Sequence, residues 1–510
     1  MLNPPVLGTA EQRGAPIAVD LLIVHATAIT MDPDRRVIED CGIAISNGRL
    51  VFVGTAEVAL AGYQPTELLD CRGHLVLPGL IDAHGHGGHA LLKTIGVDTL
   101  SWWMRIVTRT YFEHTSAEYW YADGLLSALE RLKFGVTCGV SVLGSQPRSD
   151  EPEFGAGHGR AYSELGLREV IGAGPAGLPW PREVGHWRAG KHVRREVGLA
   201  EMLAGTEELI RQWHGAAGGL IQVSVTPYTM VPSLNPGGPS TPDLATALTA
   251  EDREQSARVR ELAARYGTRI HTDAFGGMVE LAHRQDEHAL LGPDVHFQHG
   301  FGLSNSEIAI LAETGTSVTH GPGVLVGALR GRCPVVELLD AGVTVAISTD
   351  GCAPMSSFDL FTAMRQAQTL SQLQLRDIFV LPPGKLLEMV TIDAAGALGL
   401  ADEIGSLELG KAADLITLDA RQAHLQPLHM PVQALVYKAS GQDVDTVIVA
   451  GKVLMRGRLV STVDESEVLA RARQEADLLI ERSGLDRFIT EPVWRTSRQL
   501  FPSAVPFDEQ

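Results

Sequence analysis

The chain has few cysteines, no excess of positive charge and no long hydrophobic run. Its five cysteines form no C-x-x-C motif, and their odd number argues against a disulfide framework. The formal net charge of −19 argues against nucleic acid or an anionic membrane surface as a partner. Neither a basic-then-apolar leader nor an apolar run of about 18 residues occurs in the sequence. We therefore expect a cytoplasmic protein without a membrane anchor.

The composition is that of an ordinary folded protein, with 45% hydrophobic and 20% charged residues. At about 150 residues per domain, a chain of 510 residues has room for two or three domains. A symmetric homo-oligomer is the base-rate expectation for such a chain.

The central part of the chain, residues 79–404, alternates apolar strand-like runs with amphipathic stretches. The strand-like runs are "GLIDAHGH", "GVTCGVSVLG", "REVIGAGP", "LIQVSVTP", "GTRIHTDA", "VHFQHG", "TSVTHGP" and "VTVAISTD". Helices are predicted between most of them, for example over residues 119–134, 251–266 and 304–314. Eight repeats of strand and helix predict an α/β fold, a (β/α)8 TIM barrel.

Both flanks of this region are β-like. Residues 17–78 alternate short strand-like runs with turns and contain no long helical pattern, and residues 405–460, including "VQALVYKASG", resemble them. The simplest arrangement is a composite β-sandwich domain formed by the N- and C-terminal segments. Residues 1–16 are predicted to be an N-terminal tail. Residues 461–510 form a C-terminal helical extension, with a helix over 464–482 that packs on the barrel or on a second subunit.

Three histidines, His84, His86 and His89, lie within "IDAHGHGGHAL". Roughly 0.6 H-x-H pairs are expected by chance, so the setting must decide. The apolar run over residues 74–83 predicts a buried strand ending at His84, and residues two apart on a strand share a face. His84 and His86 are therefore candidate metal ligands. His89 lies beyond the predicted strand, in a Gly-Gly segment, and is not expected to be one.

Other polar residues stand at the predicted ends of later strands: His271, His299, His320 and Asp350. The carboxyl ends of barrel strands meet at one mouth, so these side chains should converge with His84 and His86. Imidazoles and a carboxylate suit a borderline divalent ion. Such an ion lowers the pKa of a bound water towards about 7 and so supplies hydroxide at neutral pH. Asp350 and a histidine that does not bind the ion would then move protons.

Two long segments, residues 97–107 and 175–198, follow predicted strands 1 and 3 and should lie at the same mouth. They carry Trp102, Trp103, Trp180 and Trp187. We expect these tryptophans, with His320, to line an apolar or aromatic substrate pocket. The alternative is that each tryptophan only fastens its loop to the barrel.

Several of these stretches occur in a recognisable order: "PGLIDAHGH", "DTLSWWMR", "RIHTDA", "VHFQHGFGLS", "VAISTDG" and "GSLELGKAADLITLD". Together they resemble the amidohydrolase superfamily, in its cytosine-deaminase-like and triazine-hydrolase-like (chlorohydrolase) branch. The resemblance implies a (β/α)8 barrel with a composite β-sandwich.

The resemblance also implies roles for individual residues. His84, His86, His271 and Asp350 would bind one catalytic divalent metal, and His299 would orient or deprotonate the attacking water. Zinc is the expected metal, with iron, cobalt and manganese as alternatives. Members with two metals bridge them through a lysine on strand 4, and "LIQVSVTPY" contains none.

Two positions depart from the pattern of the ring deaminases in this branch. Their H-x-x-E motif is replaced by "HTDA", with Ala274 in place of the glutamate and Asp273 one residue early, where it should face the other way. Leu325 stands where many members have an asparagine.

These departures favour hydrolysis of an amide, urea or carbamate C–N bond in a small, fairly apolar molecule. Metal-bound hydroxide would attack the carbonyl, with His299 and the metal stabilising the oxyanion. The alternative is an aminohydrolase or chlorohydrolase that removes ammonia or chloride from a heteroaromatic ring. A more remote alternative is a non-catalytic relative that keeps the barrel as a scaffold.

The metal content of the purified protein tests the ligand prediction. We expect about one divalent ion per chain, as for a catalytic site with one ion. His86→Ala and His271→Ala should lose the ion, whereas His89→Ala should keep it, measured by elemental analysis. A wild-type protein that takes up no metal would contradict the prediction.

Overall fold

The computed structural model describes residues 15–95, 103, 107–234, 247–323 and 331–489. At its centre is a parallel sheet whose strands run in the order β16-β15-β14-β13-β12-β9-β8-β6, with β7 paired to β8. The strands are β6 (Leu80–Asp82), β7 (His86–Gly87), β8 (Val136–Leu143), β9 (Arg168–Ala173), β12 (Ile221–Val225), β13 (Ile270–Ala274), β14 (Val295–His299), β15 (Ser317–His320) and β16 (Val345–Ile347). The predicted (β/α)8 barrel is confirmed.

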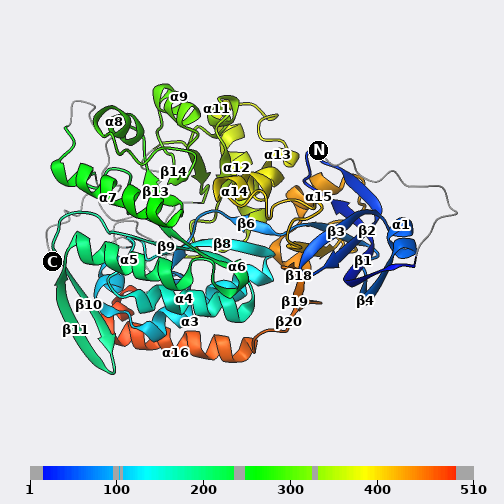
Figure 1. Cartoon of the computed structure of the whole chain (residues 1–510), viewed down its shortest axis with the longest axis horizontal. Helices are drawn as coiled ribbons and strands as arrows, with labels where there is room; N and C mark the ends of the chain where they lie inside the picture. The colour runs from blue at the N-terminus through cyan, green and yellow to red at the C-terminus, as the bar shows by residue number, and fades with distance from the viewer. Residues whose placement is uncertain (1–14, 96–102, 104–106, 235–246, 324–330, 490–510) are drawn as a thin grey trace, which may run out of the picture.

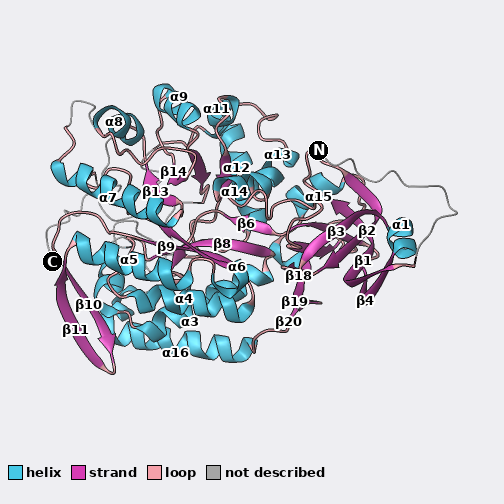
Figure 2. Cartoon of the chain, in the orientation of Figure 1, coloured by secondary structure: helices cyan, strands magenta, loops and turns pink. Residues whose placement is uncertain are grey.

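Helices surround this sheet (Figure 2). They are α3 (Ala117–Lys133), α4 (Pro152–Leu165), α5 (Leu199–Trp213), α6 (Ala216–Gly219), α7 (Ala250–Tyr266), α8 (Met278–Gln285), α9 (Asn305–Thr314), α11 (Val335–Asp340), α12 (Leu360–Leu375), α13 (Pro383–Met389) and α14 (Ile392–Ala397), with single turns η1 (Ala90–Leu92) and η2 (Thr110–His114). Helices α7 and α9 begin with capping boxes and end at left-handed glycines, so local sequence sets their ends. Among the described residues, no helix is both long and apolar enough to cross a membrane.

A second sheet joins the two ends of the chain, at the right of Figure 1. Its strands run in the order β20-β19-β18-β17-β5-β1-β2-β3, with β4 paired to β1. They are β1 (Ile17–Ile29), β2 (Val37–Ser46), β3 (Arg49–Thr55), β4 (Tyr63–Asp70), β5 (His74–Pro78), β17 (Leu415–Asp419), β18 (Val444–Val449), β19 (Lys452–Arg456) and β20 (Leu459–Val460). Ile43, Val76, Leu415 and Ile448 lie in one buried apolar cluster, so both ends of the chain build one core. The predicted composite β unit is thus present.

The single strand predicted over residues 74–83 is wrong. The run divides at Gly79 into β5, which pairs with β17 in the terminal sheet, and β6, which pairs with β8 in the barrel. A Cβ on Gly79 would lie 2.0 Å from Oγ1 of Thr137 on β8. Only glycine therefore lets the chain pass from one sheet to the other so close to β8.

One other local prediction is also wrong, and two further segments contain elements that the sequence did not indicate. Residues 432–441 lie mainly in helix α15 (Pro431–Lys438), where Pro431 occupies the first turn, a position that favours proline. A short helix, α1 (Ala56–Gly62), interrupts the N-terminal β segment. The long segment after β9 contains an antiparallel hairpin of β10 (Arg182–Arg188) and β11 (Lys191–Val197).

The predicted helix over residues 464–482 is α16 (Glu465–Ser483). It lies beside α3 along the lower edge of the barrel (Figure 1). Its apolar side chains Val468, Ala472 and Leu479 belong to the barrel's hydrophobic core. Within one chain, the helix therefore packs on the barrel.

Buried polar contacts join the first barrel strand to the last. Asp82, at the end of β6, accepts hydrogen bonds from the backbone nitrogen and hydroxyl of Thr349, both at 2.9 Å. The Asp82 carboxylate also pairs with Arg131 at 3.1 Å, and both side chains are almost fully buried. The backbone nitrogen of Asp350 donates to the carbonyl of His84 at 3.2 Å. These contacts bring the ends of β6 and β16 together.

Asp82→Asn tests this link. The substitution leaves the buried Arg131 guanidinium without its carboxylate, so we expect the free energy of unfolding to fall by about 3–5 kcal/mol. Urea unfolding measures the loss. The exposed pair of Arg49 and Glu403 serves as a control, since Glu403→Gln should cost less than about 1 kcal/mol. Equal losses in the two variants would contradict a special role for Asp82.

Candidate functional site

A cluster of buried histidines and carboxylates lies where the barrel strands end. His84 Nε2 lies 2.7 Å from Asp350 Oδ1 and 3.3 Å from His86 Nε2, and His86 Nε2 is 3.3 Å from the same oxygen. His84, His86 and Asp350 form one group whose donor atoms lie within 4.8 Å of one another. The structure thus brings together the ends of β6, β7 and β16.

His271 approaches the other side of the His84 ring. Its Nε2 is 2.6 Å from His84 Nδ1, and His84, His271 and Asp273 form a second group of donor atoms within 4.8 Å. His84 belongs to both groups. All four predicted metal ligands therefore lie in one cluster, connected through His84.

Backbone carbonyls orient two of these rings. His86 Nδ1 donates to the carbonyl of Gly144 at 2.9 Å, and His271 Nδ1 donates to that of His296 at 3.2 Å. With Nδ1 occupied, Nε2 of each ring is the nitrogen left to bind an ion.

His296 was not singled out from the sequence. Its ring stacks on that of His271, with centroids 4.3 Å apart, and the two residues are paired in the ladder of β13 and β14. The available signal was its position in "VHFQH", three residues before His299, because pairing the two strands sets His296 against His271.

His299 and Asp350 have left-handed backbone conformations, with φ of 84° and 61°. Residues other than glycine seldom adopt such angles, and this strain concentrates at functional sites. The His299 ring stacks against Phe275 at 4.9 Å and Phe301 at 5.8 Å between ring centroids. The two rings hold the imidazole in place beside the cluster.

Asp273 does not face away from the site, contrary to the prediction. Its carboxylate lies 3.6 Å from His299 Nε2 and belongs to the donor group of His84 and His271. Asp273 and His271 are two residues apart on β13, so their side chains share a face. The prediction assumed that the side chain at position 274 faces the site. On β13 that side chain instead points to the face opposite to His271 and Asp273. A carboxylate therefore lies in the site although position 274 is alanine.

Burial and mutual charge set the protonation of the cluster. Burial lowers the pKa of His271 to about 3, so this imidazole is neutral and its lone pair is available. Burial raises the pKa of Asp350, but hydrogen bonds from His84 and His86 outweigh it and hold the pKa well below its ordinary value. Burial likewise raises the pKa of Asp273, but the charge of His299 outweighs it and the pKa is lowered. Two ionised carboxylates thus lie among buried imidazoles.

This donor set fits a divalent cation. His84, His86 and Asp350 offer two imidazole nitrogens and one carboxylate oxygen within 4.8 Å of one another, and His271 Nε2 lies 2.6 Å from His84 Nδ1, in hydrogen-bond contact. Nitrogen ligands with one carboxylate are those that zinc binds. The residues present are therefore chemically suited to hold such an ion.

The remaining predicted site residues are scattered. Trp103 contacts the His89 ring edge-on at 5.3 Å, and His89 in turn lies 4.6 Å from the His86 ring. His320 lies at the end of β15 beside Phe301, with its Nδ1 buried and without a hydrogen-bond partner. Trp102 and Leu325 lie outside the described residues.

The other two tryptophans contact groups away from these histidines. Trp180 donates to Gln255 at 3.3 Å. The Trp187 ring stacks on that of His192 at 5.6 Å between centroids, and the guanidinium of Arg482 lies over the Trp187 ring at 5.2 Å. The hairpin of β10 and β11 is thereby attached near the end of α16.

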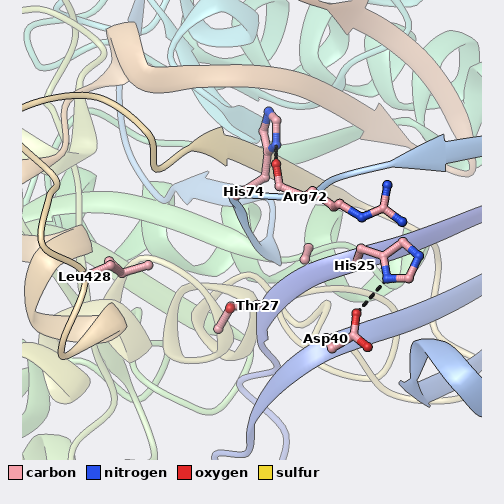
Figure 3. A pocket seen from close by; sticks show the side chains of 8 residues that line it. His25, Thr27, Asp40, Arg72, His74 and Leu428 are labelled. Atoms are coloured by element: carbon pink, nitrogen blue, oxygen red, sulfur yellow. Dashed lines mark hydrogen bonds and ion pairs between the residues drawn. The ribbon is translucent and has the colours of Figure 1, made fainter.

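A hollow of about 270 Å³ lies in the terminal β unit, away from the histidine cluster (Figure 3). Its lining includes His25, Asp40, Arg72 and His74. His25 pairs with Asp40 at 2.7 Å, and Arg72 pairs with Asp70 at 2.5 Å. Because these charges are already paired, the hollow lacks the unpaired polar groups of the barrel cluster.

Comparison with known proteins agrees with the family resemblance of the sequence motifs. Residues 75–454 match the model of the amidohydrolase family. The chain is 34% identical over 446 residues to a 5-methylthioadenosine/S-adenosylhomocysteine deaminase of Desulforudis audaxviator, covering 86% of this chain and 95% of the relative. It is 31% identical over 475 residues to a 5'-deoxyadenosine deaminase of Methanosarcina mazei, covering 91% and 99%.

Solved structures agree with the fold. An adenosine deaminase from Xanthomonas campestris with bound zinc superposes with a TM-score of 0.78 at 27% identity, covering 91% of this chain and all of the other. A mutant of an atrazine chlorohydrolase from Arthrobacter aurescens, complexed with zinc and atraton, gives a TM-score of 0.72 at 22% identity, covering 89% and 100%. The second likeness shows the fold alone. The zinc bound to the adenosine deaminase supports a divalent metal in this site.

His320 makes the stability of the metal-free protein depend on pH. Burial, together with the charge of His299, lowers the pKa of His320 from 6.5 to about 4. Because the unfolded chain binds this proton more readily, stability is lost as pH falls from 6.5 towards 4. The loss is on the order of 3 kcal/mol. Urea unfolding at several pH values should show a smaller loss in His320→Asn. Identical profiles would contradict the assignment.

Proposed function

This chain belongs to the amidohydrolase family and is a hydrolase of C–N bonds other than peptide bonds; within this class, we propose that it removes ammonia from an amino-substituted heteroaromatic ring. The substrate is a small molecule of the nucleoside type, as the names of its relatives suggest. The observation that carries the proposal is the Asp273 carboxylate beside His299, because the absence of a glutamate at position 274 was the main argument against a ring deaminase.

His84, His86, His271 and Asp350 would hold one divalent ion, zinc in the first instance. When bound, the ion acts as a Lewis acid and makes a water molecule a nucleophile near neutral pH. His299, held between Phe275 and Phe301, would orient the water. It would also stabilise the negative charge that develops on the atoms bonded to the attacked carbon. The carboxylate of Asp350 would accept the proton of the water and return it to the leaving amine.

A ring deaminase must also protonate a ring nitrogen, since the aromatic system is interrupted when the carbon becomes tetrahedral. Asp273 is suited to this task. Its carboxylate is ionised, lies among the same histidines and can take a proton and deliver it to the ring. Asp273 would thus do the work of the glutamate that related ring deaminases carry one position later.

A second candidate reaction is hydrolysis of an amide, urea or carbamate C–N bond in a small, fairly apolar molecule. Ala274 favours it, since an acyl substrate has no ring nitrogen to protonate. Phe275 and Phe301 beside His299 also favour a substrate with apolar surface. The same ligands and the same two proton carriers would serve both reactions.

We further propose a cytoplasmic homo-oligomer. All five cysteines are free and buried, which suits a reducing compartment. Large apolar side chains are exposed at the end of α12 and just beyond it, at Leu373, Ile378 and Phe379. Exposed apolar patches are typical of surfaces that bind another protein, and here a second copy of the chain is the simplest partner.

Asp273→Asn tests the proposed proton carrier. Ammonia release should be measured with adenosine, 5'-deoxyadenosine and 5-methylthioadenosine, beside a panel of simple amides, ureas and carbamates. We expect the wild type to deaminate at least one of the aminopurines and Asp273→Asn to lose about 100-fold or more in kcat. Asp273→Glu, which keeps a carboxylate on the same face of β13 as His271, should retain more of the activity than Asp273→Asn.

The metal content of each variant serves as the control. If Asp273→Asn keeps both its metal and its activity on aminopurines, the role given to Asp273 is wrong. Activity of the wild type on amides, ureas or carbamates alone would replace the first candidate reaction by the second.

A further inference from the structure

A buried carboxylate holds the segment that follows His86. Asp123, on α3, has no exposed surface. Its Oδ2 accepts the backbone N–H of Gly88 at 2.6 Å, and its Oδ1 accepts that of Ala90 at 2.8 Å. The two amides flank His89, so each oxygen of one carboxylate fixes one side of that residue.

Asp123 is itself held by a buried chain of charges. His158 Nε2 lies 3.1 Å from Asp123 Oδ2, and His158 Nδ1 lies 3.0 Å from Glu169 Oε1. An imidazole can donate to two carboxylates only when both nitrogens carry a proton. Burial lowers the pKa of His158, but its hydrogen bonds to Asp123 and Glu169 outweigh this and raise the pKa to about 9. His158 is thus a buried cation between two carboxylates.

The segment of residues 87–90 is packed closely against its neighbours. A Cβ on Gly87 would lie 2.8 Å from His158, and one on Gly88 would lie 2.6 Å from the Tyr111 ring. On the far side, Gly144 and Ser145, which follow β8, contact His86 and His89 respectively. The segment therefore lies between the buried charges on one side and these two residues on the other.

We propose that Asp123, fixed by His158 and Glu169, is a positioning residue that keeps His86 and His89 oriented toward the metal cluster. It acts through the backbone of residues 87–90 and touches neither substrate nor metal. With both amides bound, the segment cannot rotate, and His86 Nε2 stays 3.3 Å from Asp350. The inference rests on the proposed metal site.

Asp123→Asn tests the inference with little change in shape. An amide has only one oxygen, so one of the two backbone N–H groups then faces an NH2 group. Because partners that orient a ligand typically change metal affinity 10- to 100-fold, we expect the dissociation constants for Zn²⁺ and Co²⁺ to rise at least about 10-fold. We also expect an altered visible absorption spectrum at saturating Co²⁺ and faster hydrogen exchange in peptides covering residues 86–92.

Asp252→Asn is the matched control. Asp252 is equally buried and also accepts two backbone N–H groups, from Ser233 at 2.7 Å and Thr249 at 2.8 Å, at the start of α7. This variant can lower the melting temperature, but its metal affinity and cobalt spectrum should match the wild type. A general loss of stability would affect both variants alike.

Unchanged metal affinity and cobalt spectrum in Asp123→Asn would overturn the inference. If that variant does not fold, hydrogen exchange in the wild type decides: residues 86–92 should exchange as slowly as β8, and exchange at the rate of an open loop would overturn it. A wild type that binds no ion refutes the proposed metal site, and the exchange comparison alone then decides whether Asp123 holds the segment.

Discussion

The position of the whole site depends on the buried carboxylate of Asp82. It receives both hydrogen bonds from Thr349 and pairs with Arg131, so it joins the first strand of the barrel to the last. His84 lies two residues after Asp82 and Asp350 one residue after Thr349. A ligand from the start of the barrel and a ligand from its end therefore meet because the buried Asp82 carboxylate accepts two of its hydrogen bonds from Thr349.

The protonation states of the histidine cluster follow from the burial of its side chains. Imidazoles taken out of water lose protons more readily, and the carboxylates among them stay ionised because the histidines donate to them. His271 is neutral and Asp350 is anionic, the forms in which each can bind a cation. The barrel thus prepares the ligand set before any ion arrives, with His84 Nδ1 and His271 Nε2 in hydrogen-bond contact at 2.6 Å.

The outer parts of the chain support this centre from two directions. Asp123 on α3 holds the segment after His86, and α16 packs against α3 from outside the barrel. The hairpin of β10 and β11, in turn, contacts the end of α16 through Trp187 and Arg482. Segments far apart in the sequence therefore share one packed layer around the helix that carries Asp123.

The amino-acid sequence by itself determined the architecture and the residue types of the site. Periodic apolar runs and helix caps are local signals, so α7, α9 and α16 were predicted within one or two residues, and the order of the barrel strands followed. The family resemblance, carried by the order of short motifs, was likewise a property of the sequence, and the family match over residues 75–454 agrees with it. The sequence predicted a strand where the structure has helix α15. A run of eight residues is too short to distinguish the 3.6-residue period of a helix from the two-residue period of a strand.

Only the tertiary structure decided where side chains point and what surrounds them. Asp273 was expected to face away, and its place beside His299 follows from the register of β13 against β14 and from the common face that it shares with His271. Asp123 carried no signal of its own, since its partners are distant in the chain, and the place of His296 beside His271 follows only from the pairing of β13 with β14. Contacts between residues far apart depend on packing in three dimensions, which the spacing of residues along one chain does not contain.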